Sequence, residues 1–185
     1  MALRQILTEP NQILREKSLF VEIVDNDIQK LMYDMVETMY AAPGIGLAAI
    51  QVGVPKRVIV LDIGWRNKSE STDDEKQVAK KNPIYFVNPE IITKSTNNST
   101  YEEGCLSVPG QFAEIDRPDK CHVKYLDYHG QPKEIKTEGM LATCIQHEID
   151  HLEGILFIDY LSKLKKSMII KKLFKQKKAI ERIVV

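Results

Sequence analysis

The stretch His147-Glu148-Ile149-Asp150-His151 combines the residue types and the spacing that most clearly suggest chemistry in this chain of 185 residues. Residues four apart lie one turn above each other on a helix, so the imidazoles of His147 and His151 can bind one metal ion from the same side. Glu148 falls beside them, where its carboxylate can take a proton from a water molecule on that ion. The alternative is two ordinary histidines with a chance glutamate between them. The pattern favours a metal site that activates water.

The third ligand decides the kind of metal site, and two common peptidase patterns do not fit. A metzincin continues the motif to a third histidine. Here Gly154 is in place, but Phe157 stands at the histidine position. A thermolysin-like enzyme takes a glutamate ligand from a later helix. Apart from Glu153, beside the motif, the only later glutamate is Glu181 in a lysine-rich tail. The chain therefore lacks a good third ligand of either the metzincin or the thermolysin type.

Cys105, in the run Glu102-Glu103-Gly104-Cys105-Leu106-Ser107, is a better candidate for the third ligand. The chain has three cysteines and no C-x-x-C pair, so a disulfide framework does not explain this thiol. The preceding glycine lets the end of a short extended segment approach a metal closely. A thiolate with two imidazoles leaves a fourth position open to water, which is the catalytic type of site. The alternative is a free cysteine that acts as a small buried hydrophobic residue.

The run Gly44-Ile45-Gly46-Leu47-Ala48-Ala49-Ile50-Gln51 superficially matches the G-x-G-x-x-A fingerprint of dinucleotide sites. That fingerprint follows a strand and opens a helix. Here a strong helical pattern precedes the run and a strand over Arg57–Asp62 follows it, so the order is reversed. A nucleotide site is therefore not expected, and a tight glycine turn filled by small residues is the simpler alternative.

Together, G-I-G-L-A-A-I-Q, E-G-C-L-S and Q-H-E-I-D-H-L resemble, in their order and spacing, the three signature motifs of the peptide deformylase family. The resemblance runs from Ile6-Leu7 to beyond Gly154. It implies an α+β fold and a hydrolase that removes the formyl group from the N-terminal formyl-methionine of newly made polypeptides, releasing formate. The partners it implies are formyl-methionyl nascent peptides, and neither a membrane nor DNA is expected.

The resemblance also implies roles for single residues. Cys105, His147 and His151 would hold the metal, and Glu148 would move the proton from water to the leaving amine. The Gln51 side-chain amide and the Leu106 backbone N–H would stabilise the developing oxyanion. Iron as Fe²⁺, one ion per chain, is the metal implied in the cell, while Zn²⁺, Ni²⁺ or Co²⁺ can replace it in purified protein.

For the substrate, the resemblance implies an extended peptide that pairs with the Gly44–Gly46 loop and the region of Gly104 like an added strand. The methionine side chain would enter an apolar pocket. The candidates for the pocket wall are Ile45, Thr143, Cys144 and His147. Thr143 is smaller and more polar than the aliphatic residue often found there. Phe112 stands where some relatives have arginine, so a charged contact to the far end of the peptide is not expected.

The elements that must position these residues indicate an α+β fold. Apolar residues from Ile28 to Tyr40 follow helical spacing, with Asn26 or Asp27 as N-cap. Strands are predicted over residues 58–61, 84–87, 91–94, 122–128 and 134–137, the last two forming a hairpin. The helix that carries His147 is apolar on most faces, which places it centrally. We therefore predict mixed or antiparallel sheets packed around this helix, followed by a C-terminal helix.

Composition supports a single catalytic domain over residues 1–185. The chain is 43% apolar and 28% charged, as soluble globular proteins are, and its length allows one sizeable core. Residues 65–82 are polar and are predicted to be an exposed loop. Met1–Gln5 leads into no long apolar stretch, so neither a signal peptide nor a membrane span is expected, and we predict a cytoplasmic protein. His122, His129 and Cys121 lack ligand spacing.

Charge is balanced overall but concentrated at the end of the chain. From Leu161 onward there are nine basic residues and one acidic residue, against 17 and 25 before it. We predict a basic C-terminal helix over residues 161–182, which in related bacterial enzymes docks on the ribosome. The alternative is a solvated amphipathic helix without a partner. Two other functions stay open at this point: an H-E-x-x-H metallopeptidase, and a non-catalytic ribosome- or nucleic-acid-binding module with a structural metal.

Overall fold

The computed structural model describes residues 2–64 and 81–183 of the protein. Its helices are α1 (Asn26–Ala41), α2 (Gly139–Leu152) and α3 (Lys163–Ile183), with the short 3₁₀ helices η1 (Gln12–Arg15), η2 (Ala49–Val52) and η3 (Phe157–Tyr160). Its strands are β1 (Gly46–Ala48), β2 (Val58–Leu61), β3 (Ile84–Lys94), β4 (Asn98–Cys105), β5 (Val108–Pro118), β6 (Lys120–Leu126) and β7 (Pro132–Glu138). The predicted loop over residues 65–82 lies outside the described residues, apart from residues 81 and 82.

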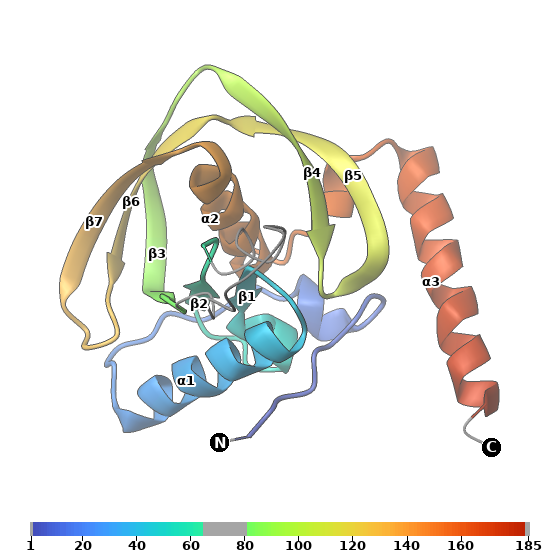
Figure 1. Ribbon diagram of the computed structural model, residues 1–185, viewed down its shortest axis with the longest axis horizontal. Coiled ribbons are helices and arrows are strands. Elements are labelled where there is room, and N and C mark those ends of the chain that lie inside the picture. Colours follow the sequence, from blue (N-terminus) through green and yellow to red (C-terminus); the bar gives the residue numbers. More distant parts are fainter. Residues whose placement is uncertain (1, 65–80, 184–185) are drawn as a thin grey trace, which may run out of the picture.

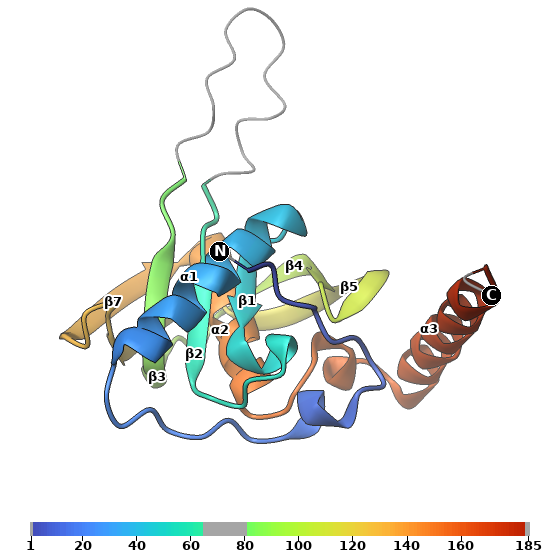
Figure 2. The same ribbon diagram turned by 90° about the horizontal axis from the view of Figure 1, so that it is seen from below.

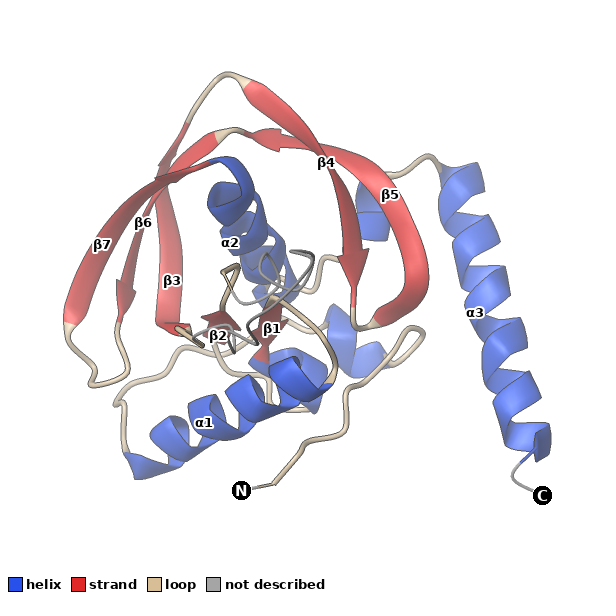
Figure 3. Cartoon of the chain, viewed as in Figure 1, coloured by secondary structure: helices blue, strands red, loops and turns tan. Residues whose placement is uncertain are grey.

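Two antiparallel sheets surround α2. One sheet has the strand order β1-β2-β3-β6-β7, and the other is the β4–β5 pair. Figure 1 shows α2 between the two sheets, with α1 below them and α3 at the side next to β5. Figure 3 shows the same arrangement by element type. The predicted α+β fold, with a central helix that carries the H-E-x-x-H run, is confirmed.

Strand β2 is buried on both of its faces, which explains why its sequence is apolar throughout. Successive side chains of a strand point to opposite faces. Val58 and Val60 pack in the cluster that contains the apolar side of α1, whereas Ile59 and Leu61 pack in the cluster of α2. All four side chains are fully buried. Strand β2, which pairs with β1, is therefore packed on both faces.

Helix α1 begins two residues before the predicted apolar pattern. Its N-cap is Asp25 rather than Asn26 or Asp27, and the Asp25 carboxylate accepts a hydrogen bond of 2.9 Å from the backbone N–H of Ile28. A capping side chain must precede the first helical residue, and the acidic neighbours Asp25 and Asp27 both offered a suitable oxygen. The predicted helix is otherwise confirmed.

The predicted strands over residues 84–87 and 91–94 are one strand, β3. Asn88 has a positive φ of 51° and Pro89 follows it, so the apolar alternation breaks although pairing with β6 resumes after a register shift. The Asn88 side chain bonds both backbone groups of Val21 and thereby fastens the N-terminal segment to the sheet. The predicted hairpin of residues 122–128 and 134–137 is confirmed as β6 and β7.

Helix α2 ends in a glycine stop. The N–H of Gly154 donates to the carbonyl of His151, and the N–H of Ile155 donates to that of Asp150, which is the Schellman arrangement. Gly154 has a φ of 74°, and a β-carbon there would overlap the backbone of Arg15. The N–H of Ser18 also donates to the carbonyl of Leu152. The N-terminal segment is thus packed against the end of the helix that carries the motif.

Helix α3 begins at Lys163, two residues later than predicted, because Ser162 caps it and Leu161 packs beneath η3 and β5. Leu173 is buried against the same cluster, while most lysines between residues 163 and 178 face solvent. Figure 2 shows α3 standing at the side of the body. Among the described helices, none has the length and the apolar character that a membrane crossing needs.

Candidate metal centre and active site

Helix α2 presents one continuous stripe of side chains to a cleft. The cleft-lining residues of this helix are Met140, Thr143, Cys144, His147 and Glu148. Their spacing of three and four residues places them on one face. His151 follows one turn beyond His147, and the two rings meet edge to face with centroids 5.0 Å apart. Both imidazoles and the carboxylate of Glu148 are buried.

Cys105 reaches the two histidines from the end of β4. Its sulfur lies 3.3 Å from Nε2 of His151. One donor atom from each of Cys105, His147 and His151 lies within 4.8 Å of the other two. The register of β4 on β5 shifts between Gly104 and Cys105, at the end of the strand. The structure therefore brings together the three ligands predicted from sequence. A sulfur and two imidazole nitrogens around one point fit a divalent transition-metal ion.

Glu103 holds His147 in place, and this contact was not predicted. Its Oε2 lies 2.7 Å from Nδ1 of His147, which leaves Nε2 of that ring for a ligand. Arg117 donates to both oxygens of Glu103 and, at 2.7 Å, to Asp150. Arg117 and Glu103 are both nearly inaccessible to solvent. A carboxylate on the second nitrogen of a metal-binding histidine fixes the ring and raises its basicity.

The surroundings of His147, Glu148 and His151 shift the pKa values of these three side chains in different directions. Burial lowers the pKa of His151, and the charges of His147 and Arg117 lower it further, so this ring stays neutral in the absence of a metal. Burial also lowers the pKa of His147, but its contacts with Cys105 and Glu103 outweigh burial and raise the pKa well above its ordinary value. Burial raises the pKa of Glu148 to about 7. A carboxyl that titrates near neutrality suits proton transfer.

Gly46 is the residue that makes room for Glu148. A β-carbon at this position would overlap the Glu148 carboxylate and would lie 2.7 Å from the Leu61 side chain. The second oxygen of Glu148, Oε2, is buried and has no hydrogen-bond partner in the described part of the chain. The carboxylate is therefore packed tightly on one side and retains one acceptor for a ligand.

Gln51 is oriented with its amide nitrogen toward Cys105. Its Oε1 accepts a bond of 2.8 Å from the backbone N–H of Ala48, so Nε2 must face the other way. That nitrogen lies 3.0 Å from Oγ of Ser107 and 3.5 Å from the sulfur of Cys105. Gln51 is only 1% exposed. A hydrogen-bond donor is thus preplaced beside the three candidate ligands, as an oxyanion site requires.

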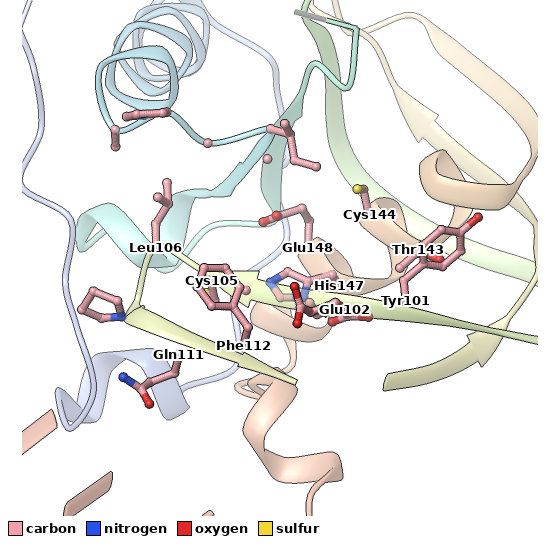
Figure 4. Close-up of a pocket in the computed structure, with 18 of the residues that line it drawn as sticks. Tyr101, Glu102, Cys105, Leu106, Gln111, Phe112, Thr143, Cys144, His147 and Glu148 are labelled. Atoms are coloured by element: carbon pink, nitrogen blue, oxygen red, sulfur yellow. The ribbon is translucent and has the colours of Figure 1, made fainter. Parts of the chain in front are cut away.

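The cleft has a volume of about 460 Å³ and contains the predicted substrate-binding positions. Ile45, Gly46, Gly104, Thr143 and Cys144 all line it, together with Gln51 and Leu106. Figure 4 shows Thr143, Cys144 and Tyr101 at one end, Glu148, His147 and Cys105 in the middle, and Leu106 and Gln111 at the other end. Phe112 lines the cleft with 64% of its surface exposed and lies against Gly104.

Two residues that line the cleft were not predicted from the sequence. Tyr101 and Met140 line the cleft, although the sequence suggested only a strand and an apolar helix for them. The stripe through Thr143 and His147 extends back to Met140 by helical spacing, so that signal was present. His122, His129 and Cys121 lie elsewhere: His122 pairs with Glu134, and Cys121 is buried in the core. They are not part of the metal cluster found in the described residues.

Comparisons with known proteins find relatives over nearly the whole chain. Residues 3–167 match the Polypeptide deformylase family. A peptide deformylase of Pelagibacter ubique is 63% identical over 177 residues, which cover 96% of each chain. One from Maricaulis maris is 54% identical, with 98% of each chain covered. A crystal structure of peptide deformylase from Ehrlichia chaffeensis in complex with actinonin is 44% identical with a TM-score of 0.85, and covers 95% of this chain and 98% of that one.

Proposed function

Because the chain belongs to the polypeptide deformylase family, it is a hydrolase that removes the formyl group from nascent peptides, and we propose that this reaction takes place where Cys105, His147 and His151 meet. The observation that supports the proposal is the convergence of one sulfur and two imidazoles beside a buried Glu148 in an open cleft. The family does not favour an H-E-x-x-H peptidase or a non-catalytic ribosome- or nucleic-acid-binding module with a structural metal.

Each side chain of the site has a separate role in the proposed reaction. Cys105, His147 and His151 would hold a divalent ion, and when bound this ion would supply Lewis-acid chemistry for activating water and the formyl group. Glu148 accepts the proton that the attacking water loses and passes it to the nitrogen of the leaving amine. The Gln51 amide and the Leu106 backbone N–H donate to the formyl oxygen as the carbon becomes tetrahedral. Glu103 keeps His147 in the required tautomer.

The substrate backbone lies along β4. In the part of the chain that the structure describes, β4 pairs only with β5, so its other edge can accept a peptide as an added strand. Ile45 and Gly46 line the same cleft as Gly104 of β4. The formyl-methionine side chain then enters the end of the cleft formed by Tyr101, Met140, Thr143 and Cys144.

The direct test is formate release from formyl-Met-Ala-Ser by purified protein, with acetyl-Met-Ala-Ser and an unformylated peptide as controls. We expect formate from the first peptide alone. Glu148→Ala should lower kcat by at least about 100-fold, the usual contribution of a general base. A near-wild-type rate for this variant at full metal occupancy would show that Glu148 does not carry the proton. Cleavage of an internal bond in the unformylated peptide would indicate a peptidase.

We propose Fe²⁺ as the ion used in the cell, one per chain. The donor set also accepts Zn²⁺, Co²⁺ or Ni²⁺, and affinity alone does not identify the working ion. Ferrous iron beside a thiolate is sensitive to oxygen, through the ion or through Cys105. Anaerobically purified protein should contain iron, and its activity should decay in air. Equal, air-stable turnover after reconstitution with Zn²⁺ would count against a need for iron.

We further propose that residues 1–185 act as one catalytic domain in the cytoplasm, and that α3 brings it to the ribosome. Leu173 packs α3 on the body, and Lys166 lies 2.5 Å from Asp159. Lys171, Lys172, Lys175 and Lys178 remain exposed. Exposed lysines on one helix can neutralise phosphates of ribosomal RNA.

A further inference from the structure

The hydroxyl group of Thr143 is buried in the cleft without a hydrogen-bond partner. The residue is 4% exposed, and its Oγ1 contacts no donor or acceptor in the described residues. A threonine inside a helix commonly bonds the carbonyl four residues earlier, here that of Gly139, but this bond is absent. Buried polar groups are almost always paired, and an exception calls for a reason. A ligand that completes the bond is such a reason, because Thr143 lines the cleft.

The position of Thr143 fits the first side chain of a bound peptide. It lies one turn before His147 on the cleft-facing stripe of α2, which is about 6 Å along the helix axis. Figure 4 shows it at the end of the cleft, with Tyr101 and Cys144. A methionine whose formyl group is held near Cys105 and Glu148 has its sulfur three bonds beyond Cα, so the tip of the side chain reaches toward this end.

We propose that the Thr143 hydroxyl donates a hydrogen bond to the tip of the substrate's first side chain, so that the pocket accepts formyl-methionine sulfoxide peptides as well as formyl-methionine peptides. The inference rests on the proposed function of the cleft. A thioether sulfur is a weak acceptor, whereas the oxygen added by oxidation makes the tip polar. Norleucine has the same length without any acceptor, so it leaves the hydroxyl buried and unpaired.

The neighbours of Thr143 are compatible with such a tip. Burial raises the pKa of the Cys144 thiol to about 12, so this side chain is neutral and presents a weak S–H donor rather than a charge. Tyr101 lies at the same end of the cleft (Figure 4), and Met140, one helical turn before Cys144 on α2, also lines the cleft. The pocket therefore combines apolar wall for the methylene groups with one buried hydroxyl that is unpaired in the described residues.

The test compares three peptides that differ only in the first side chain: formyl-Met-Ala-Ser, formyl-norleucine-Ala-Ser and formyl-methionine-sulfoxide-Ala-Ser. Wild-type protein should cleave the sulfoxide peptide with a kcat/KM within about tenfold of the methionine peptide, since one neutral hydrogen bond offsets most of the loss of apolar character. Thr143→Val, which removes the hydroxyl at nearly constant shape, should lower kcat/KM for the sulfoxide about tenfold, lower it for methionine about two- to threefold, and raise it for norleucine. Thr143→Ser, which retains a hydroxyl, should rank the three peptides by kcat/KM in the same order as wild type.

Two further measurements make the outcome decisive. Thr38→Val is the matched control, because the Thr38 hydroxyl is equally buried but already donates to the carbonyl of Asp34 at 2.7 Å, outside the cleft; it should leave the order of the three peptides unchanged. In wild type, the affinities for the three deformylated product peptides should rank in the same order as the kcat/KM values of the three substrates. In Thr143→Val this ranking of the affinities should be lost. Equal scaling of all three substrates by Thr143→Val, or failure of wild type to cleave the sulfoxide, would overturn the inference while leaving deformylation established. Absence of formate from every formyl peptide would instead overturn the proposed function, and the inference with it.

Discussion

The Nδ1 atom of His147 lies 2.7 Å from Oε2 of Glu103, whereas the Nδ1 atom of His151 has no hydrogen-bond partner in the described residues. The two histidines of the motif are therefore held differently: the Nδ1 side of His147 is fixed by a carboxylate that Arg117 secures, whereas His151, among the described residues, contacts only the Cys105 sulfur through its Nε2 and is otherwise held by packing. The orientation of His147 should consequently depend on a residue outside the three proposed ligands.

Replacing Glu103 by alanine should weaken metal binding. The change removes the acceptor that orients His147 and leaves Arg117 with one partner fewer, and loss of such a contact typically costs 10- to 100-fold in affinity. Competition with a chelator of known affinity measures the effect. Glu114→Gln, which removes an exposed carboxylate from the neighbouring strand β5, is the control. An unchanged affinity in Glu103→Ala would mean that packing suffices to orient the ring.

Glu148 should destabilise the metal-free protein at neutral and higher pH. Its folded-state pKa is about 7 against 4.5 in an unconstrained chain, so the folded state holds its proton more tightly. Stability then falls as pH rises from about 4.5 to about 7 and is level above that. Glu148→Gln has no titrating group at this position, so its free energy of unfolding does not fall in this way. It should exceed that of wild type by about 3 kcal/mol at pH 8 and by about 1 kcal/mol or less near pH 5.

Urea unfolding of both chelator-treated proteins at the two pH values measures this difference. The exposed Glu22→Gln change controls for the loss of one negative charge at the surface. A difference between Glu148→Gln and wild type that does not grow with pH would mean that burial does not hold the Glu148 proton.

Gly46→Ala should damage catalysis more than folding. The new methyl group would push the Glu148 carboxylate out of its position, and a displacement of about 1 Å in a reacting group can cost about 100-fold. We therefore expect kcat to fall by about that factor while the protein still binds metal. Gly64→Ala is the matched control, since a β-carbon there would meet only an ordinary contact of 3.6 Å. Full activity in Gly46→Ala would show that Glu148 has free space to move.

Neutralising the lysines of α3 should separate ribosome binding from chemistry. The variant changes Lys171, Lys172, Lys175, Lys177 and Lys178 to glutamine. Deformylation of a free peptide needs only the cleft and should stay within about twofold of wild type, whereas co-sedimentation with ribosomes should fall and lose its dependence on salt. A control variant changes five exposed lysines of the body, namely Lys30, Lys94, Lys124, Lys133 and Lys136. Unchanged co-sedimentation of the α3 variant would mean that these lysines only solubilise the helix.

The central helix could be predicted from sequence because its signal is local. Helical spacing puts His147, Glu148 and His151 on one side wherever the helix lies, and Gly154 marks its end. Cys105 was inferred from chemistry, because a lone thiol beside a glycine suits a metal site better than a disulfide framework. The β4–β5 pair that carries it was not predicted in full, since the alternation along Asn98–Cys105 and Val108–Pro118 is masked by charged residues on both faces.

Contacts between distant segments account for what was missed. Glu103 lies two residues before Cys105 on a strand, so both side chains face α2, and that spacing could have indicated a partner for a ligand. Nothing local tells which histidine Glu103 meets, or that Arg117 reaches Asp150. The unpaired hydroxyl of Thr143 is likewise visible only when the surrounding walls are in place.

The three proposed ligands come from two pieces of chain that are distant in sequence: two from α2 and one from the end of β4. A cation held by all three joins the hairpin of β4 and β5 to the helix, much as a covalent cross-link would. Such binding stabilises only the folded arrangement, by about 4 kcal/mol when the free ion is a thousandfold above its dissociation constant. With the metal bound at this proposed site, metal supply would govern not only how fast the protein works but also how long its hairpin stays docked, and a chelator would act on this molecule as a local denaturant.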